Sequence, residues 1–174
     1  ELSGSINNSG LIAAQAYGST ESASAAGIYV DSDITATGRI TNSGTISAFA
    51  DGTYSITATG IHVSGDMDGI ITNTSTGLIS AEVNEHSPSS STNFAYGIYI
   101  DGELTGTLNN AGTITADATQ SDNYTAAAYG VYVEGDLSGL LKNTGSIDVH
   151  ATGTGYTAEA YGIYLDSGMT GILT

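Results

Sequence analysis

The hexapeptide AYGVYV (residues 128–133) decides the fold of this chain, because variants of it return at nearly regular intervals. The other copies are AAGIYV (25–30), ATGIHV (58–63), AYGIYI (95–100) and AYGIYL (160–165). A Gly-x-(Ile/Leu) segment precedes each copy and begins once more at the end of the chain, with central residues Ile6, Ile40, Ile71, Leu108, Leu141 and Leu173. Their spacings of 34, 31, 37, 33 and 32 residues indicate a repeat array or solenoid.

A second segment in each copy shows the alternation of a strand with one buried face. Its first apolar residue is always Ile, followed two and four residues later by Ala or Val; these isoleucines are Ile12, Ile46, Ile79, Ile114 and Ile147. A period of two favours a strand over a helix. In the hexapeptide we expect Ile28 and Val30 to point inward, Tyr29 to point outward, and the preceding Gly27 to mark a bulge or bend.

The sequence therefore predicts an all-β fold, a parallel β-helix with three short strands per rung. Residues 1–174 form one solenoid, with repeats at about 1–34, 35–68, 69–105, 106–138 and 139–170 and a partial sixth at 171–174. Rungs stack at about 4.8 Å, so each repeated position becomes a column along the axis. No pattern in the sequence specifies the handedness.

Composition excludes several classes of function. Eighteen acidic residues face only Arg39 and Lys142 as bases, giving a net charge of −16, so we expect no nucleic-acid partner. The chain has no cysteine, which suits secretion through an oxidising compartment. No apolar run approaches the roughly 18 residues of a membrane-spanning helix, so we expect no direct membrane insertion.

The repeat unit G-x-I-x-N-x-G-x-I-x-A…A-x-G-I-Y-V-x-G-x-L resembles the repeats in the passenger regions of bacterial autotransporters and related large surface adhesins. The resemblance implies a right-handed β-helix, export across the outer membrane, and an adhesive or stalk-like role at the bacterial cell surface. We therefore expect a structural or adhesive extracellular module, either a stalk fragment or a filament subunit, that is not an enzyme. Its expected partners are a host or surface glycan or a protein receptor.

Two alternative functions suit the same fold. A polysaccharide-binding or polysaccharide-cleaving β-helix is one, but a cleaving enzyme needs cations near an acidic substrate, and Arg39 and Lys142 lie three rungs apart, about 14 Å along the axis. An ice-binding solenoid is the other, although outward threonines such as Thr41, Thr72 and Thr113 do not form an unbroken array. His86 and His150 lack the repeated partners of a catalytic triad.

Two kinds of side-chain ladder are expected along the columns. One is an asparagine ladder at a corner, formed by Asn8, Asn42, Asn73, Asn110 and Asn143. The other is an outward aromatic column of Tyr29, His62, Tyr99, Tyr132 and Tyr164, flanked by Tyr96, Tyr129 and Tyr161. Amide ladders and stacked rings stabilise neighbouring rungs, but an exposed tyrosine strip also suits sugar rings or a neighbouring filament.

The turns after the third strand place acidic residues in two further columns. These are Asp31, Asp101, Glu134 and Asp166, and Asp33, Asp66, Glu103 and Asp136. Carboxylates about 5 Å apart repel one another by roughly 0.8 kcal/mol in water, so the edge is either well solvated or screened by a cation. If calcium binds, the best candidate ligands are Asp101, Glu103, Glu134 and Asp136; no other cofactor is expected.

Neither end of the sequence resembles a polar cap. Residue 1 stands just ahead of a Gly-x-Ile segment, and residue 174 lies inside one. An uncapped solenoid exposes unpaired strand edges. We therefore expect self-association end to end, or continuation into a longer solenoid.

Overall fold

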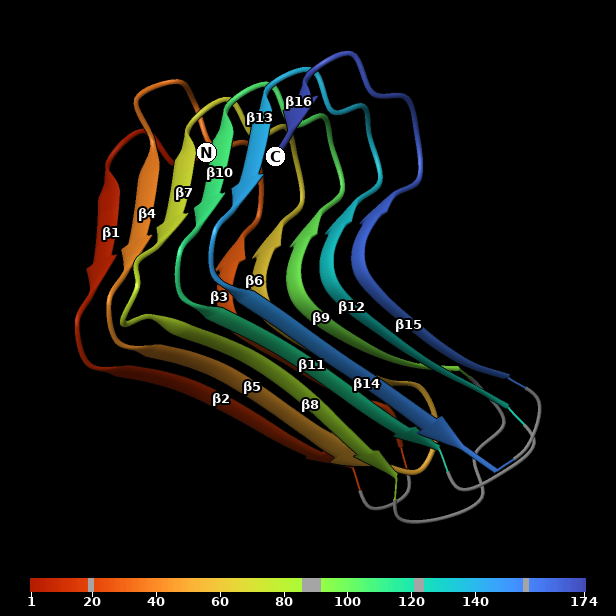
Figure 1. Cartoon of the computed structure of the whole chain (residues 1–174). Coiled ribbons are helices and arrows are strands. Elements are labelled where there is room, and N and C mark those ends of the chain that lie inside the picture. The colour runs from red at the N-terminus through yellow and green to blue at the C-terminus, as the bar shows by residue number, and fades with distance from the viewer. Residues whose placement is uncertain (19–20, 86–91, 121–123, 155–156) are drawn as a thin grey trace.

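The computed structural model describes residues 1–18, 21–85, 92–120, 124–154 and 157–174. These residues contain sixteen strands and no helix. The strands form three parallel sheets, each built from one strand per repeat, so the predicted parallel β-solenoid with three strands per rung is confirmed (Figure 1). Within the described ranges, no helix is long and apolar enough to cross a membrane.

Each rung passes through the three sheets in the same order. The first sheet contains β1 (Ser5–Asn8), β4 (Arg39–Asn42), β7 (Ile70–Asn73), β10 (Thr107–Asn110), β13 (Leu140–Asn143) and β16 (Ile172–Leu173). The second contains β2 (Leu11–Gly18), β5 (Thr45–Gly52), β8 (Leu78–Glu85), β11 (Thr113–Gln120) and β14 (Ser146–Gly153). The third contains β3 (Ala23–Val30), β6 (Ile56–Val63), β9 (Asn93–Ile100), β12 (Thr125–Val133) and β15 (Thr157–Leu165). Rung 1 comprises β1, β2 and β3, and rungs 2 to 5 follow in threes.

The register between rungs is the one that the repeats predict. In the second sheet Ile46 pairs with Ile79, and Ile79 pairs with Ile114. In the third sheet Tyr99 pairs with both His62 and Tyr132. Every copy of a repeated residue therefore lies directly above the preceding copy, because a slip of one residue would turn the buried Ile face toward solvent.

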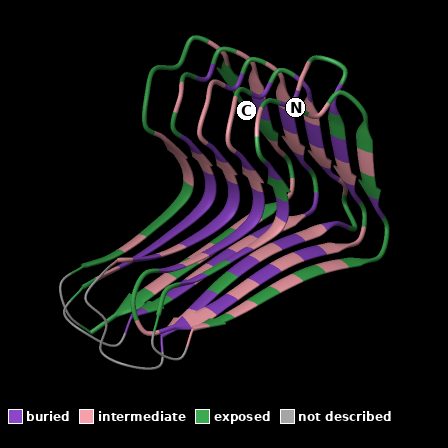
Figure 2. Ribbon diagram, turned by 180° about the vertical axis from the view of Figure 1, so that it is seen from behind, coloured by how far each residue is buried: buried purple, intermediate pink, exposed green. Residues whose placement is uncertain are grey.

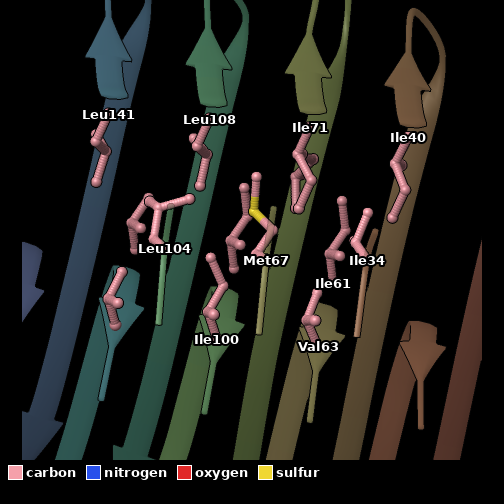
Figure 3. Packing of buried hydrophobic residues seen from close by; sticks show 14 of the residues in the cluster. Ile34, Ile40, Ile61, Val63, Met67, Ile71, Ile100, Leu104, Leu108 and Leu141 are labelled. Atoms are coloured by element: carbon pink, nitrogen blue, oxygen red, sulfur yellow. The ribbon is translucent and has the colours of Figure 1, made fainter. Parts of the chain in front are cut away.

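The interior has a wide part and a narrow part. Large aliphatic side chains from all three sheets fill the wide part, including Ile40, Ile71 and Leu108 of the first sheet (Figure 3). Small residues such as Ala48, Ala81 and Ala95 fill the narrow part, between the end of the second sheet and the start of the third. Figure 2 shows the buried residues concentrated in the middle rungs. Alanine at these positions lets the two sheets approach each other closely.

A fourth inward column, which lies outside the three sheets, closes each rung between the third and first sheets. Isolated parallel bridges connect its members, which are Leu2, Ile34, Met67, Leu104, Leu137 and Met169. Ile34, Met67, Leu104 and Leu137 are fully buried. They pack on the first-sheet column, as Figure 3 shows for Ile34, Met67 and Leu104.

The strands of the third sheet bend (Figure 1), and their pairing is interrupted at the glycine of the hexapeptide, as between Tyr96 and Ile98 of β9. Gly60 is required there because an added Cβ would lie 2.5 Å from the Ile79 Cγ2 methyl group and 2.5 Å from the Gly97 carbonyl oxygen. The bend places Ala95 and Ile98, three residues apart, both in the interior. Tyr96 and Tyr99, also three residues apart, consequently both point to the outward side of the sheet, where their rings pack against each other.

The two terminal rungs leave their apolar residues uncovered. Leu11 and Tyr17 of rung 1 are 70% and 68% exposed, and Ile172 of β16 is 61% exposed. The inward residues show the missing neighbour directly, because Leu173 of β16 is 43% exposed whereas Ile71 and Leu108 of the same column are fully buried between neighbouring rungs. The outer edges of β2 and β14 have no partner strand within the described part of the chain.

Candidate functional site

The asparagine column forms a continuous chain of side-chain hydrogen bonds inside one corner. Each Nδ2 donates to the Oδ1 of the next rung, at 2.8 Å from Asn8 to Asn42, 2.9 Å from Asn42 to Asn73, and 2.8 Å from Asn73 to Asn110. The last bond, from Asn110 to Asn143, is 2.7 Å long. The same Nδ2 groups also donate to backbone carbonyls, such as that of Ser146 at 3.2 Å from Asn110. These bonds satisfy buried amides, so the column has a structural role.

The outer corner is the outward side of the bend in the third sheet, and two aromatic columns meet there. Tyr29, His62, Tyr99, Tyr132 and Tyr164 form the first column, with neighbouring ring centroids between 4.8 and 5.2 Å apart. His62 and Tyr99 stack at an interplanar angle of 11°, whereas Tyr29 is tilted by 60° to His62. Stacking and edge contacts both suit the quadrupoles of the rings.

Tyr96, Tyr129 and Tyr161 form the second column, in which neighbouring rings stack at 5.2 and 5.5 Å. The sequence suggested an exposed strip, but Tyr96 and Tyr129 are only 9% and 7% exposed. The bend explains the difference, because it brings the Tyr96 ring to 4.7 Å from the Tyr99 ring of the first column. In rungs 3 to 5 the outer corner is therefore filled by a double layer of rings.

The first acidic column accepts hydrogen bonds from the aromatic column beside it. Tyr99 Oη donates to Glu134 Oε2 of the following rung at 2.7 Å, and His62 Nε2 lies 3.0 Å from Asp101 Oδ1 of the following rung. In the first rung Tyr29 Oη donates at 3.1 Å to Asp31 of the same rung. These contacts hold the rings of the first aromatic column in place.

Burial raises the pKa of several of these phenols and so keeps them protonated at alkaline pH. It raises the pKa of Tyr129 and Tyr132 to about 12, and nearby carboxylates add to the effect. The pKa of Tyr99 is also raised, mainly by burial and further by hydrogen bonds to Glu134 and Asp101. A protonated phenol is a hydrogen-bond donor, so the raised pKa preserves the contacts between the rings and the acids.

The second acidic column binds backbone amides of the neighbouring rung. Asp33 Oδ1 accepts a bond from the Asp66 amide at 3.0 Å, Asp66 Oδ1 one from the Glu103 amide at 2.9 Å, and Asp136 Oδ1 one from the Gly168 amide at 2.7 Å. Glu103 accepts instead from Ser138 Oγ at 2.6 Å. An acidic side chain here therefore connects one turn to the next.

The four candidate calcium ligands lie in adjacent rungs, with Asp101 beside Glu134 and Glu103 beside Asp136. Among the described residues, no three His, Cys, Asp or Glu side chains converge into a group that would hold a metal ion. Calcium binding stays a prediction. Of the two histidines considered for a triad, His150 is exposed and lies 3.1 Å from Asp148, and His86 is outside the described residues.

Rungs 1 and 2 carry Ala26 and Thr59 where the next three rungs carry the tyrosines of the second column. These smaller residues leave a hollow of about 500 Å³ in the outer corner. The rings of Tyr29, His62 and Tyr99 line one side, and Ser24, Thr57 and Thr59 line the remainder. The repeat pattern alone does not predict this hollow, although the replacement of Tyr by Ala and Thr in rungs 1 and 2 is its signal in the sequence.

A cluster of buried polar side chains at the narrow end of the interior was also missed. Gln120 and Glu85 occupy inward positions where rungs 1, 2 and 5 have glycine. Gln120 donates to Glu85 at 3.4 Å, and Asn93, which is fully buried, donates to Gln120. The alternation predicts apolar residues at inward positions, so no signal in the sequence brings these three residues together.

Comparison of the chain with protein-family models, with curated proteins and with solved structures found no significant match.

Proposed function

We propose that this chain is a structural or adhesive module of a bacterial extracellular surface protein, a stalk fragment or filament subunit, and not an enzyme. The unbroken asparagine ladder from Asn8 to Asn143 supports the proposal most strongly. It connects all five rungs with bonds of nearly equal length. Uniform connection between repeats gives a rod the nearest-neighbour stability of a solenoid.

Both ends of the solenoid supply a means of assembly. Leu11 and Tyr17 at one end and Ile172 at the other leave apolar surface on the terminal rungs, beside unpaired strand edges. Such edges pair readily with further strands. We propose that further rungs, either of the same chain or of a second copy, cover these ends.

The charge of the chain supports an extracellular partner that is not a polyanion. A net charge of −16 disfavours binding to nucleic acid and to anionic lipid surfaces. The acidic turns also disfavour side-by-side association of separate rods. A neutral glycan or a protein receptor remains compatible with this surface. The absence of cysteine and the autotransporter-like repeats support a location outside the bacterial cell.

Labelling of intact cells tests this location. An antibody raised against the purified chain is applied to intact and to permeabilised cells of the organism that encodes it, with a cytoplasmic protein as the control. We expect labelling of intact cells. Labelling that requires permeabilisation would contradict the proposal. Electron microscopy of the purified chain distinguishes the two forms of the module, because a stalk fragment gives short rods and a filament subunit gives continuous fibres.

Of the alternative functions, polysaccharide binding is the one that an observation favours, because the hollow in the outer corner combines rings and hydroxyl groups. No comparable observation favours ice binding. Thr41 and Thr72 of the first sheet share their outward column with Asn7, Asn109 and Lys142, so the threonine array is short.

A further inference from the structure

The outer corner keeps the same register in every rung but has two different fillings. In rungs 3 to 5 the second aromatic column packs against the first, and Tyr96 and Tyr129 are almost fully buried. In rungs 1 and 2 the first column remains, but Ala26 and Thr59 replace the partner rings. The hollow of about 500 Å³ therefore occupies the space that tyrosine side chains fill elsewhere in the same molecule.

The size of the hollow suits a small ligand or one unit of a larger one. Binding pockets for small molecules typically measure about 300–1,000 Å³ and combine apolar walls with a few polar groups. Here the walls are the rings of Tyr29, His62 and Tyr99, and the polar groups are the hydroxyls of Ser24, Thr57 and Thr59. Tyr29 is 53% exposed, so its ring is accessible to a ligand.

Three contacts fix the ring wall before any ligand arrives. His62 stacks on Tyr99 at 4.8 Å and lies 3.0 Å from Asp101, while Tyr29 donates to Asp31 at 3.1 Å. Side chains that are held in place lose little conformational entropy when a ligand binds. The wall is consequently preorganised.

The charges around the hollow select against anionic ligands. Asp31 and Asp101 lie beside the ring wall, whereas Arg39 and Lys142 belong to the first sheet, on another side of the solenoid. A uronate or sialate would therefore meet carboxylates with no lysine or arginine in the lining to offset them. A neutral ligand meets no such repulsion.

We propose that the hollow in the outer corner of rungs 1 and 2 binds a neutral pyranose unit of a glycan. The C–H face of a pyranose packs on an aromatic ring, and its hydroxyls bond to Ser24 and Thr57. An aromatic side chain of a protein partner would fill the same volume but leave those hydroxyls desolvated without partners, which is unfavourable. The proposal deepens the adhesive form of the proposed function by assigning it a ligand class and a site.

A printed array of neutral, aminated and anionic oligosaccharides, probed with the purified chain, tests the ligand class. We expect binding to neutral oligosaccharides and none to uronate-containing or sialylated ones. The dissociation constant for the best neutral oligosaccharide is then measured by titration calorimetry with the variants below. Absence of binding to every neutral oligosaccharide, or binding to the anionic ones alone, would overturn the proposal.

The variant Thr59→Tyr tests the site, because it places in rung 2 the residue that rungs 3 to 5 already carry. We expect it to fold normally and to weaken binding of the neutral oligosaccharide by about tenfold or more. Thr72→Tyr adds the same side chain to an outward position of the first sheet and should leave binding unchanged. Unaltered binding by Thr59→Tyr would overturn the site.

Tyr29→Ala provides a second variant if Thr59→Tyr fails to fold, since Tyr29 is exposed and packs only on the outside. It should weaken neutral-glycan binding and leave the circular dichroism spectrum unchanged; normal binding by this variant would also overturn the site. These measurements use the purified chain. Failure of glycan binding and failure of surface labelling are therefore separate results, and either can occur without the other.

Discussion

The inward and outward columns of this solenoid tolerate variation very differently. The first inward column of the second sheet is Ile in every rung, and the inward corner column of the first sheet is always Asn; the next two inward columns of the second sheet hold only Ala or Val, and only its last one, at the narrow end, varies between Gly, Glu and Gln. Of the two outward columns of the third sheet, one contains Tyr or His and the other contains Tyr, Thr or Ala. The register is the same in every rung despite these changes. Packing between rungs specifies the fold, and the outer surface remains available for function.

A matched pair of substitutions on β11 gives the largest expected contrast. Ile114→Asp places a carboxylate at a fully buried position between Ile79 and Ile147, with no partner for its charge. We expect a loss of about 4 kcal/mol or more in the free energy of unfolding. Asp117→Ala, on the outward face three residues later, should change stability by less than about 0.5 kcal/mol.

Urea denaturation followed by circular dichroism measures both variants. Equal destabilisation by the two substitutions would show that the inward and outward faces of the strand have been assigned wrongly.

The asparagine ladder gives the next largest effect. Asn110 accepts from Asn73 at 2.8 Å and donates to Asn143 at 2.7 Å, and it is 1% exposed. Asn110→Ala removes both bonds, and we expect a cost of about 1–3 kcal/mol because Asn73 and Asn143 each lose a partner inside the protein. Asn109→Ala, the outward neighbour on the same strand, is the control. A thermal midpoint that is lowered equally by both variants would contradict a special role for the ladder.

The sequence is sufficient to predict the inward columns because their spacing repeats and a one-residue slip would expose them. It also places the acidic and aromatic residues in the correct columns. It does not predict the hollow, which depends on the angle of the bend at Gly60 and Gly97 and on rings three residues apart meeting across it. The cluster of Asn93, Gln120 and Glu85 is unpredictable for a similar reason, since it joins residues of two different sheets.

The outward aromatic columns should make the stability of the chain depend on alkaline pH. The pKa of Tyr129 and Tyr132 is about 12 in the folded chain and about 10 when unfolded, so the folded state retains protons that the unfolded state releases. Stability is therefore fully present below about pH 10 and falls as pH rises from there through about 12. We expect the thermal midpoint to follow this course.

Tyr129→Phe removes one of these protons and should reduce the alkaline fall in the thermal midpoint. Tyr17→Phe, on the exposed edge of rung 1, should leave the fall unchanged. An alkaline fall that is identical in the parent chain and in Tyr129→Phe would mean that Tyr129 does not contribute to it.

Calcium should produce the smallest effect, although the acidic columns are its best candidate ligands. Each of these carboxylates already has a partner from another rung: Asp101 contacts His62, Glu134 accepts from Tyr99, Glu103 accepts from Ser138, and Asp136 accepts from the Gly168 amide. A calcium ion needs about 6–8 oxygen ligands, so binding would require several of these contacts to be exchanged for the ion.

At equal ionic strength we expect calcium and magnesium to raise the thermal midpoint equally, by screening the columns alone. If a specific calcium site exists, a free calcium concentration of 100 times its dissociation constant would add about 2.7 kcal/mol to the free energy of unfolding. That gain corresponds to a rise of several degrees in the thermal midpoint. A calcium-specific rise of that size that disappears in Glu134→Gln would establish the ion site and show that these acids do more than connect neighbouring rungs.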